Sequence, residues 1–138
     1  MRLLVAETGY PPAELGVNWP RYPAMFAHML DEAGGGFAIE GVDVAAGERL
    51  PEPLADDALL VTGSPFGVYE DHAFIVPLEE DVRRFAEAGR PVVGICFGHQ
   101  LVAQAFGAKV GKSERGWGVG VHTYELLGEA PWGQGPAR

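Results

Sequence analysis

The sequence predicts an α/β fold in which a mostly parallel sheet carries helices on both faces. Short apolar runs, typical of buried strands, alternate with longer amphipathic stretches as far as residue 107. Glycine and proline separate most of these segments. Strands that alternate with helices form parallel sheets through right-handed crossovers. A chain of 138 residues suits one domain, so we expect a single domain over residues 1–138.

The first half of the chain contains two predicted strands and one helix. The apolar run at 2–7 is typical of a buried strand. The stretch 24–33 has helical spacing of its apolar residues; Pro23 suits the first turn of that helix, and the glycines at 34–36 end it. The alternating stretch 37–45 is predicted to be the second strand.

The second half repeats this alternation. We predict a strand at 57–63, a helix at 72–89, a strand at 90–96 and a helix at 97–107, the two helices closed by glycines. Beyond them, the stretches 108–113 and 117–127 are predicted to be later strands that are antiparallel or peripheral.

Charge and composition exclude several classes of protein. A net charge of −9 argues against nucleic-acid binding through phosphates and against docking on anionic membranes. A single cysteine excludes an internal disulfide and a thiolate zinc cluster, and we expect no metal or cofactor. The apolar run at the N-terminus is too short for a signal peptide or a membrane span, so we expect a cytoplasmic protein.

The only cysteine, Cys96, lies in the sequence Gly-Ile-Cys-Phe-Gly between a predicted strand and a predicted helix. This pattern is typical of a nucleophile elbow, in which Gly94 and Gly98 let the strand and the helix approach closely. The helix N-terminus would favour the thiolate, and the N–H of Phe97 would be free to donate to an oxyanion. A lone cysteine is otherwise a small buried hydrophobic residue, but the flanking glycines favour the elbow.

A second motif, Val-Thr-Gly-Ser-Pro-Phe-Gly-Val-Tyr-Glu-Asp at 61–71, follows the third predicted strand. Its Gly-Ser-Pro sequence turns the backbone sharply and leaves N–H groups without partners. By itself it would be an ordinary turn capped by Ser64 or Asp71. Because parallel strands end at the same edge of a sheet, we expect Gly63 and Ser64 beside the elbow, with the N–H of Ser64 as the second oxyanion donor.

These two motifs resemble those of the class I (triad) glutamine amidotransferases. Gly-Ile-Cys-Phe-Gly-His-Gln is similar to the family signature G-x-C-x-G-x-Q, and the loop at 61–71 is most similar to the glutaminase part of GMP synthase and its stand-alone relatives. The resemblance implies a flavodoxin-like sheet and the hydrolysis of glutamine to glutamate and ammonia. It also implies that the ammonia passes to a synthase partner.

The resemblance also implies individual roles. Cys96 would attack the side-chain amide and form a glutamyl thioester, while the N–H groups of Ser64 and Phe97 hold the oxyanion. Gln100, one helical turn after the cysteine, would help to bind the substrate glutamine. The backbone at Trp117–Gly118 would line the same pocket.

One part of the family pattern is missing from this sequence. The family's base is a histidine in a His-x-Glu pair near the end of the domain, and no such pair is present. His122 and Glu125 are three residues apart and would face opposite sides of a strand, and His99 is a poor candidate on the elbow helix. We therefore expect a chain that lacks the C-terminal part of the domain, turns over poorly, and has an uncovered sheet edge that favours a homodimer.

Two other functions stay open. An intracellular-protease or glyoxalase-like enzyme also places a cysteine on an elbow, with Glu7 as a candidate acid, although a solvated strand end is the preferred interpretation of Glu7. A non-catalytic glutamine-binding remnant would keep the fold without the triad.

Overall fold

Four parallel strands form one sheet in the computed structural model, which describes residues 1–15, 21–116, 118–121 and 123. The strands are paired in the order β2-β1-β3-β4. Their bounds are Arg2–Ala6 for β1, Ala38–Val42 for β2, Asp57–Val61 for β3 and Val92–Gly94 for β4. This order, with β1 between β2 and β3, is that of flavodoxin-like folds.

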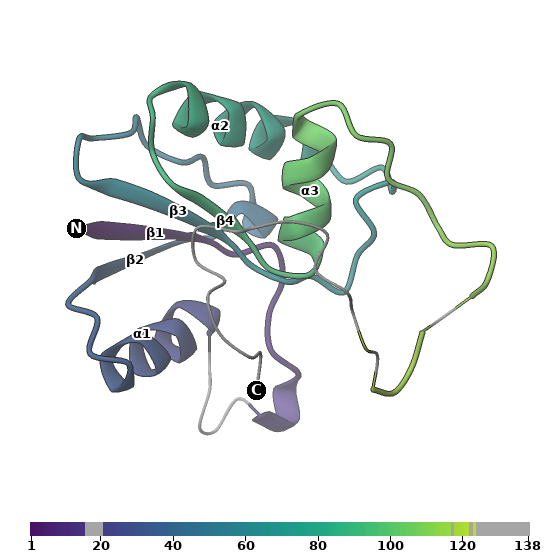
Figure 1. The fold of residues 1–138 in the computed structure, drawn as a ribbon, viewed down its shortest axis with the longest axis horizontal. Coiled ribbons are helices and arrows are strands. Elements are labelled where there is room, and N and C mark those ends of the chain that lie inside the picture. The colour runs from purple at the N-terminus through teal and green to yellow at the C-terminus, as the bar shows by residue number, and fades with distance from the viewer. Residues whose placement is uncertain (16–20, 117, 122, 124–138) are drawn as a thin grey trace.

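Helices cover both faces of the sheet, as Figure 1 shows. Helix α1 (Tyr22–Glu32) lies on one face, and α2 (Ile75–Glu87) and α3 (Phe97–Ala105) lie on the other. Two short 3-10 helices, η1 (Ala13–Leu15) and η2 (Val44–Ala46), lie in the connections after β1 and β2. The predicted α/β class and the predicted helices on both faces are confirmed.

Side-chain alternation along the strands divides the core into two layers. Leu3 and Val5 of β1 point to the face that α1 covers, where they pack with Phe26 and Leu30. Leu4 and Ala6 point to the opposite face and join the larger cluster under α2 and α3. Because both faces are buried, β1 has the continuous apolar sequence expected of a central parallel strand.

The helix ends follow the local sequence. Helix α1 has a proline in its first turn, as predicted from Pro23. Helix α2 begins at Ile75, three residues later than predicted, so Pro77 lies in its first turn, where no intrahelical N–H bond is lost. Gly89 follows α2 with φ +71°, a left-handed conformation that favours glycine.

The structure forms no strand in the residues that it describes of the two later predicted strands. Residues 108–113 form no strand, and neither do residues 118–121 and 123 of the second stretch, the rest of which lies outside the described residues. Val119 and Val121 are exposed and have no strand partner among the described residues. An alternating sequence forms a strand only where a neighbour completes its hydrogen bonds, and sequence alternation does not reveal that neighbour.

The outer edge of β4 is likewise without a partner strand in the described part of the chain. Val93 of β4 is 51% exposed, and Ile95, the residue after this strand, is 38% exposed.

In the ranges that the structure describes, no helix is long and apolar enough to cross a membrane.

An ion-pair cluster joins the amino ends of β1 and β3 to the middle of β2. The Arg2 guanidinium binds Asp57 through both carboxylate oxygens, at 2.9 and 2.7 Å, and reaches Glu40 at 3.0 Å. The hydrogen bonds from Arg2 lower the pKa of the buried Asp57 carboxyl to about 2. This cluster therefore holds β2, β1 and β3 in register at the end of the sheet opposite to the predicted site.

Candidate active site

Cys96 occupies a strained turn between β4 and α3. Its φ of 52° and ψ of −106° make it the one described non-glycine residue with positive φ. Such a conformation costs free energy of order 1–3 kcal/mol and is typical of functional sites. The thiol is exposed at the N-terminus of α3, which is the geometry that the elbow motif predicts.

The two elbow glycines are required by close backbone packing. A Cβ on Gly94 would lie 2.6 Å from the backbone nitrogen of His99, and one on Gly98 would lie 2.8 Å from the carbonyl carbon of Val61. Both distances are shorter than real Cβ contacts. Helix α3 therefore rests directly on the backbone of β3 and β4, as predicted from the spacing of the glycines.

The loop after β3 lies beside the cysteine. A Cβ built on Gly63 would be 3.8 Å from the Cβ of Cys96. Neither the N–H of Ser64 nor that of Phe97 donates a hydrogen bond within the described residues. The two expected oxyanion donors thus belong to segments that meet at Cys96, and both are free to bind a ligand.

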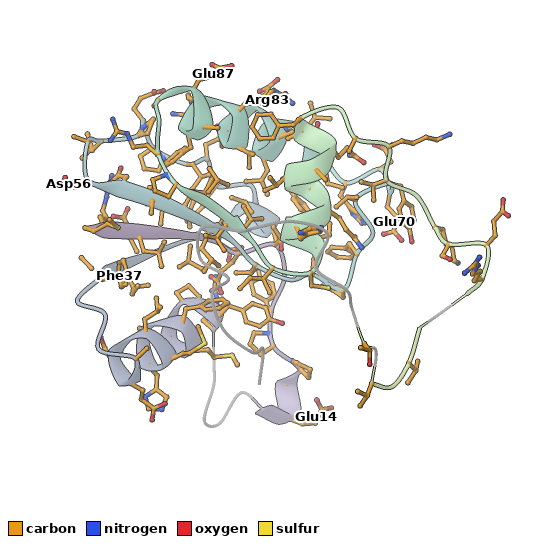
Figure 2. All side chains as sticks on the ribbon, in the orientation of Figure 1. Glu14, Phe37, Asp56, Glu70, Arg83 and Glu87 are labelled. Atoms are coloured by element: carbon orange, nitrogen blue, oxygen red, sulfur yellow. The ribbon has the colours of Figure 1, made fainter. Side chains whose placement is uncertain are left out.

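A pocket of about 370 Å³ opens at this place. Its charged side chains are Glu70 and Lys112, and Figure 2 shows Glu70 beside α3 and the segment that follows it. The hydrogen bond with His72 lowers the pKa of Glu70, so its carboxylate is ionised near neutral pH. The pocket is lined by Ser64, Pro65, Phe66, Gly67, Tyr69, Glu70, Cys96, Phe97, Gln100, Gly111, Lys112, Ser113 and Gly116.

The predicted substrate-binding residues are divided. Gln100 lines the pocket next to Cys96, as the G-x-C-x-G-x-Q pattern implies. Gly118 is exposed and is not part of the wall, which reaches Gly116 instead. Trp117 lies outside the described residues.

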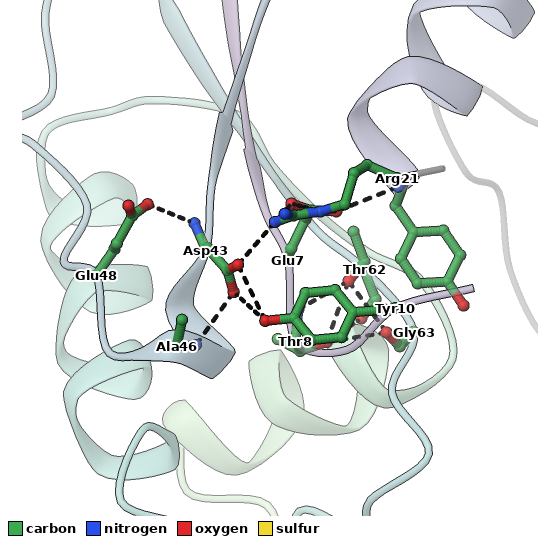
Figure 3. Close-up of polar contacts among 10 residues, drawn as sticks. Glu7, Thr8, Tyr10, Arg21, Asp43, Ala46, Glu48, Thr62 and Gly63 are labelled. Atoms are coloured by element: carbon green, nitrogen blue, oxygen red, sulfur yellow. Dashed lines mark hydrogen bonds and ion pairs between the residues drawn. The ribbon is translucent and has the colours of Figure 1, made fainter. Parts of the chain in front are cut away.

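The exposure of Glu7 differs from the one that the sequence predicts. The prediction of a solvated strand end is wrong, because Glu7 is 2% exposed. Both of its carboxylate oxygens accept hydrogen bonds from Arg21, and one also accepts the N–H of Tyr22 (Figure 3). Arg21 also donates a hydrogen bond to the carboxylate of Asp43, which accepts a second hydrogen bond from the hydroxyl of Tyr10. A partner 14 residues away in sequence explains how the carboxylate is buried, and no local signal identifies it.

The described histidines are not bonded to the thiol. His72 forms a 2.9 Å hydrogen bond with Glu70 and packs its ring against Phe66 at 4.1 Å between centroids. His99 is exposed on the first turn of α3. Neither side chain is hydrogen-bonded to Cys96, and His122 and Glu125 lie outside the described residues.

A second cavity, of about 400 Å³, lies between the 44–49 connection and the start of α2. It shares Phe66 with the cysteine pocket, but its lining contains no cysteine, serine or threonine. The pocket that contains Cys96 is therefore the candidate site. Within the described ranges, no group of three or more His, Cys, Asp or Glu side chains could hold a metal ion.

Two buried residues of the site, Thr8 and Thr62, have no signature in the sequence. Their side chains connect the end of β1 to the Gly63–Ser64 loop, and Ser64 Oγ donates a 2.6 Å hydrogen bond to the Thr8 carbonyl. They are 54 residues apart, so only the parallel pairing of β1 with β3 brings them together.

Comparisons with known proteins agree on one family. The family model for glutamine amidotransferase class-I matches residues 22–129. A glutamine amidotransferase-like protein of Gibberella zeae is 34% identical over 60% of this chain and 36% of its own length. Gamma-glutamyl peptidase 3 of Arabidopsis thaliana is 33% identical over 51% of this chain and 28% of its own. A GMP synthase [glutamine-hydrolyzing] of Tropheryma whipplei is 33% identical over 67% of this chain and 17% of its own.

A solved structure supports the same fold. The crystal structure of a glutamine amido transferase from Methylobacillus flagellatus aligns with a TM-score of 0.60 and 22% identity. The alignment covers 82% of this chain and 41% of that protein. The chain thus spans less than half the length of each of these four relatives. Because the family model matches most of the sequence, the chain belongs to the class I glutamine amidotransferase family.

Proposed function

We propose that this chain carries the glutaminase site of a glutamine amidotransferase, with Cys96 as the nucleophile. The observation that carries the proposal is the position of Cys96. It is an exposed thiol in a strained turn, at a helix N-terminus, facing a loop with a free N–H group. Such a position favours the thiolate and leaves backbone donors for an oxyanion.

The proposed reaction has two steps. The Cys96 thiolate attacks the side-chain amide carbon of glutamine, and the N–H groups of Ser64 and Phe97 bind the resulting oxyanion. The C–N bond then breaks as the nitrogen takes the proton that the thiol gave up and leaves as ammonia, which produces a glutamyl thioester. Water attacks the carbonyl carbon of the thioester, the C–S bond breaks, and a proton of the water passes to the sulfur, which releases glutamate and restores the thiol. Because neither His72 nor His99 is bonded to Cys96, we expect both proton transfers to be slow in this chain.

The charges of the pocket suit a zwitterionic amino acid. Glu70 offers a carboxylate for the α-ammonium group, and Lys112 offers an ammonium for the α-carboxylate. Gln100 adds an amide that can donate and accept. A site with one side chain of each sign would bind a free amino acid better than it would bind a compound of a single charge.

A second candidate is the cleavage of γ-glutamyl amides larger than glutamine. The pocket volume and the exposed rings of Phe66 and Tyr69 at its wall leave room for a group beyond the amide nitrogen. The chemistry at Cys96 would be the same, with an amine as the leaving group in place of ammonia.

The glyoxalase-like alternative has less support. It requires an acid that serves Cys96, and the Glu7 carboxylate is bound to Arg21 and to the Tyr22 N–H instead. Methylglyoxal turnover, measured beside glutamine turnover on the same preparation, separates the two functions.

We further propose that a synthase accepts the ammonia and that the protein acts in the cytoplasm. The support is the family, because one relative is named as a glutamine-hydrolysing GMP synthase. A net charge of −9 also disfavours nucleic acid and anionic membranes as partners.

The test is covalent labelling with 6-diazo-5-oxo-L-norleucine, a diazo-ketone mimic of glutamine. We expect stoichiometric modification of the Cys96 peptide, protection by excess glutamine but not by asparagine, and no label in Cys96→Ser. Labelling that glutamine does not slow would show that the thiol is reactive without a glutamine site, and would overturn the proposal.

A further inference from the structure

We propose that the hydroxyl groups of Thr8 and Thr62 are positioning groups that lock the peptide between Gly63 and Ser64 with its N–H toward Cys96. The inference rests on the proposed function, because it concerns one donor of the same oxyanion site. It assigns a role to two side chains that lie away from the reacting atoms.

Both hydroxyls bind the same carbonyl oxygen. Thr8 Oγ1 and Thr62 Oγ1 each donate to the Gly63 carbonyl at 3.0 Å, and Figure 3 shows this contact at the end of β1. The Thr8 N–H donates to Thr62 Oγ1 at 3.0 Å, and the two hydroxyl oxygens lie 3.1 Å apart, where either could be the donor. We assign the hydrogen of each hydroxyl to the Gly63 carbonyl, because that 3.0 Å contact is the shortest that each of them makes with an acceptor. The Gly63 carbonyl is thus held from two sides.

The direction of this carbonyl determines the direction of the Ser64 N–H. In a trans peptide, the C=O and the N–H point in opposite directions across one plane, and the described chain has no cis peptide. The Gly63 carbonyl points to the threonines. The Ser64 N–H therefore points away from them, on the loop whose Gly63 lies beside Cys96.

Thr62 also contacts the elbow. The carbonyl of Thr62 accepts the N–H of Gly98 at 3.2 Å, and it lies 3.1 Å from Thr8 Oγ1. Thr62 thereby connects the oxyanion loop to the first turn of α3, which follows Cys96 directly and begins at the other donor, Phe97. A displacement of Thr62 would change the distance between the two donors.

Burial makes the lock rigid. Thr8 and Thr62 are both fully buried, so water cannot replace a lost hydroxyl contact. Ser64 Oγ adds a third anchor, since it donates to the Thr8 carbonyl and accepts the N–H of Phe66. The loop is accordingly held in its donor orientation with no substrate bound, so the oxyanion site is formed before glutamine arrives.

The experiment compares two thiol reagents on Thr8→Val, which keeps the side-chain shape and removes the hydroxyl. The diazo-ketone glutamine mimic needs the oxyanion donors, whereas iodoacetamide alkylates a thiol by direct displacement. We expect Thr8→Val to lower the diazo-ketone rate by about 10- to 100-fold and to leave the iodoacetamide rate unchanged. Thr8→Ser, which restores the hydroxyl, should recover most of the rate.

A control separates position from stability. Val5→Ala removes buried volume from β1, the strand that precedes Thr8, on the face of the sheet that α1 covers. It should lower the thermal midpoint without changing the ratio of the two rates. Unfolding curves of every variant show which comparisons are made on folded protein. Thr62→Ser, which keeps the hydroxyl, should retain the wild-type ratio of the diazo-ketone rate to the iodoacetamide rate.

Several results would overturn the lock. The first is an unchanged diazo-ketone rate in folded Thr8→Val, and the second is an equal fall of the diazo-ketone and iodoacetamide rates in that variant. The third is a fall of the diazo-ketone rate, relative to the iodoacetamide rate, that is as large in Val5→Ala as in Thr8→Val. If the wild-type thiol reacts with iodoacetamide but never with the diazo-ketone, the proposed function fails. Crystal structures then decide the lock separately: a rotated Gly63 carbonyl in Thr8→Val supports it, and an unrotated one refutes it.

Discussion

Replacing Gly98 by alanine tests the packing on which the elbow depends. The added Cβ would lie 2.8 Å from the carbonyl carbon of Val61 and closer still to its oxygen. Ordinary contacts begin at 3.4 Å, so the first turn of α3 must move away from β3 by roughly half an ångström or more. That movement also stretches the 3.2 Å hydrogen bond from the Gly98 N–H to Thr62.

The cost follows from these contacts. Overpacking in a core typically costs about 1–3 kcal/mol, and the opposing atoms here are backbone, which cannot rotate aside, so we expect about 2–3 kcal/mol. For a chain of this size the thermal midpoint should fall by about 10 °C. Chemical denaturation measures the free energy of unfolding directly, and labelling of Cys96 should slow in the folded variant because the oxyanion donors separate.

The matched control is Gly36→Ala, in which the same methyl group enters open space at negative φ. It should be neutral or slightly stabilising. If Gly98→Ala lowers the free energy of unfolding by no more than this control, α3 does not rest on β3 as described, and the argument for the elbow is refuted.

Other predictions concern charge and association. Glu70→Gln and Lys112→Met should each weaken glutamine binding by about tenfold in calorimetry, whereas Asp71→Asn, outside the pocket wall, should not; equal affinities would remove the two charges from the binding site. Asp57 has its pKa lowered to about 2 by Arg2, so its ionised form stabilises the fold above about pH 4, and this contribution is lost as pH falls toward 2. Urea denaturation should therefore show a lower free energy of unfolding for Asp57→Asn than for wild type at pH 7. As the pH falls from 4 to 2, the variant should lose less stability than wild type, and parallel plots of stability against pH for the two proteins would contradict this prediction. The exposed β4 edge should support a homodimer in sedimentation, which Val93→Lys should abolish.

The parts of the fold that could be predicted are those set by local pattern. Buried strands such as 2–7 and 57–63 are apolar because both faces of a parallel sheet are covered, and the structure has β1 and β3 there. The turn at Cys96 was predictable because its requirement, two glycines at fixed spacing, is also local.

The parts that could not be predicted depend on partners distant in the chain. Thr8 meets Thr62 only because β1 pairs with β3, and a threonine after a strand has no distinctive sequence signal. The sequence around Glu7 predicts a solvated residue, because no local signal identifies Arg21 as its partner. The stretch 108–113 is predicted to be a strand, but its sequence does not show whether a neighbouring strand is present to pair with it.

We propose that Cys96 forms a covalent bond to the glutamyl group of glutamine during the reaction. The most direct measurement is to incubate the chain with glutamine, quench in acid, and determine the mass of the Cys96 peptide. We predict an adduct with the mass of a glutamyl group, released by hydroxylamine, present in wild type, reduced in Thr8→Val and absent in Cys96→Ser. Folded protein that alkylates with iodoacetamide but never carries this adduct would contradict the claim.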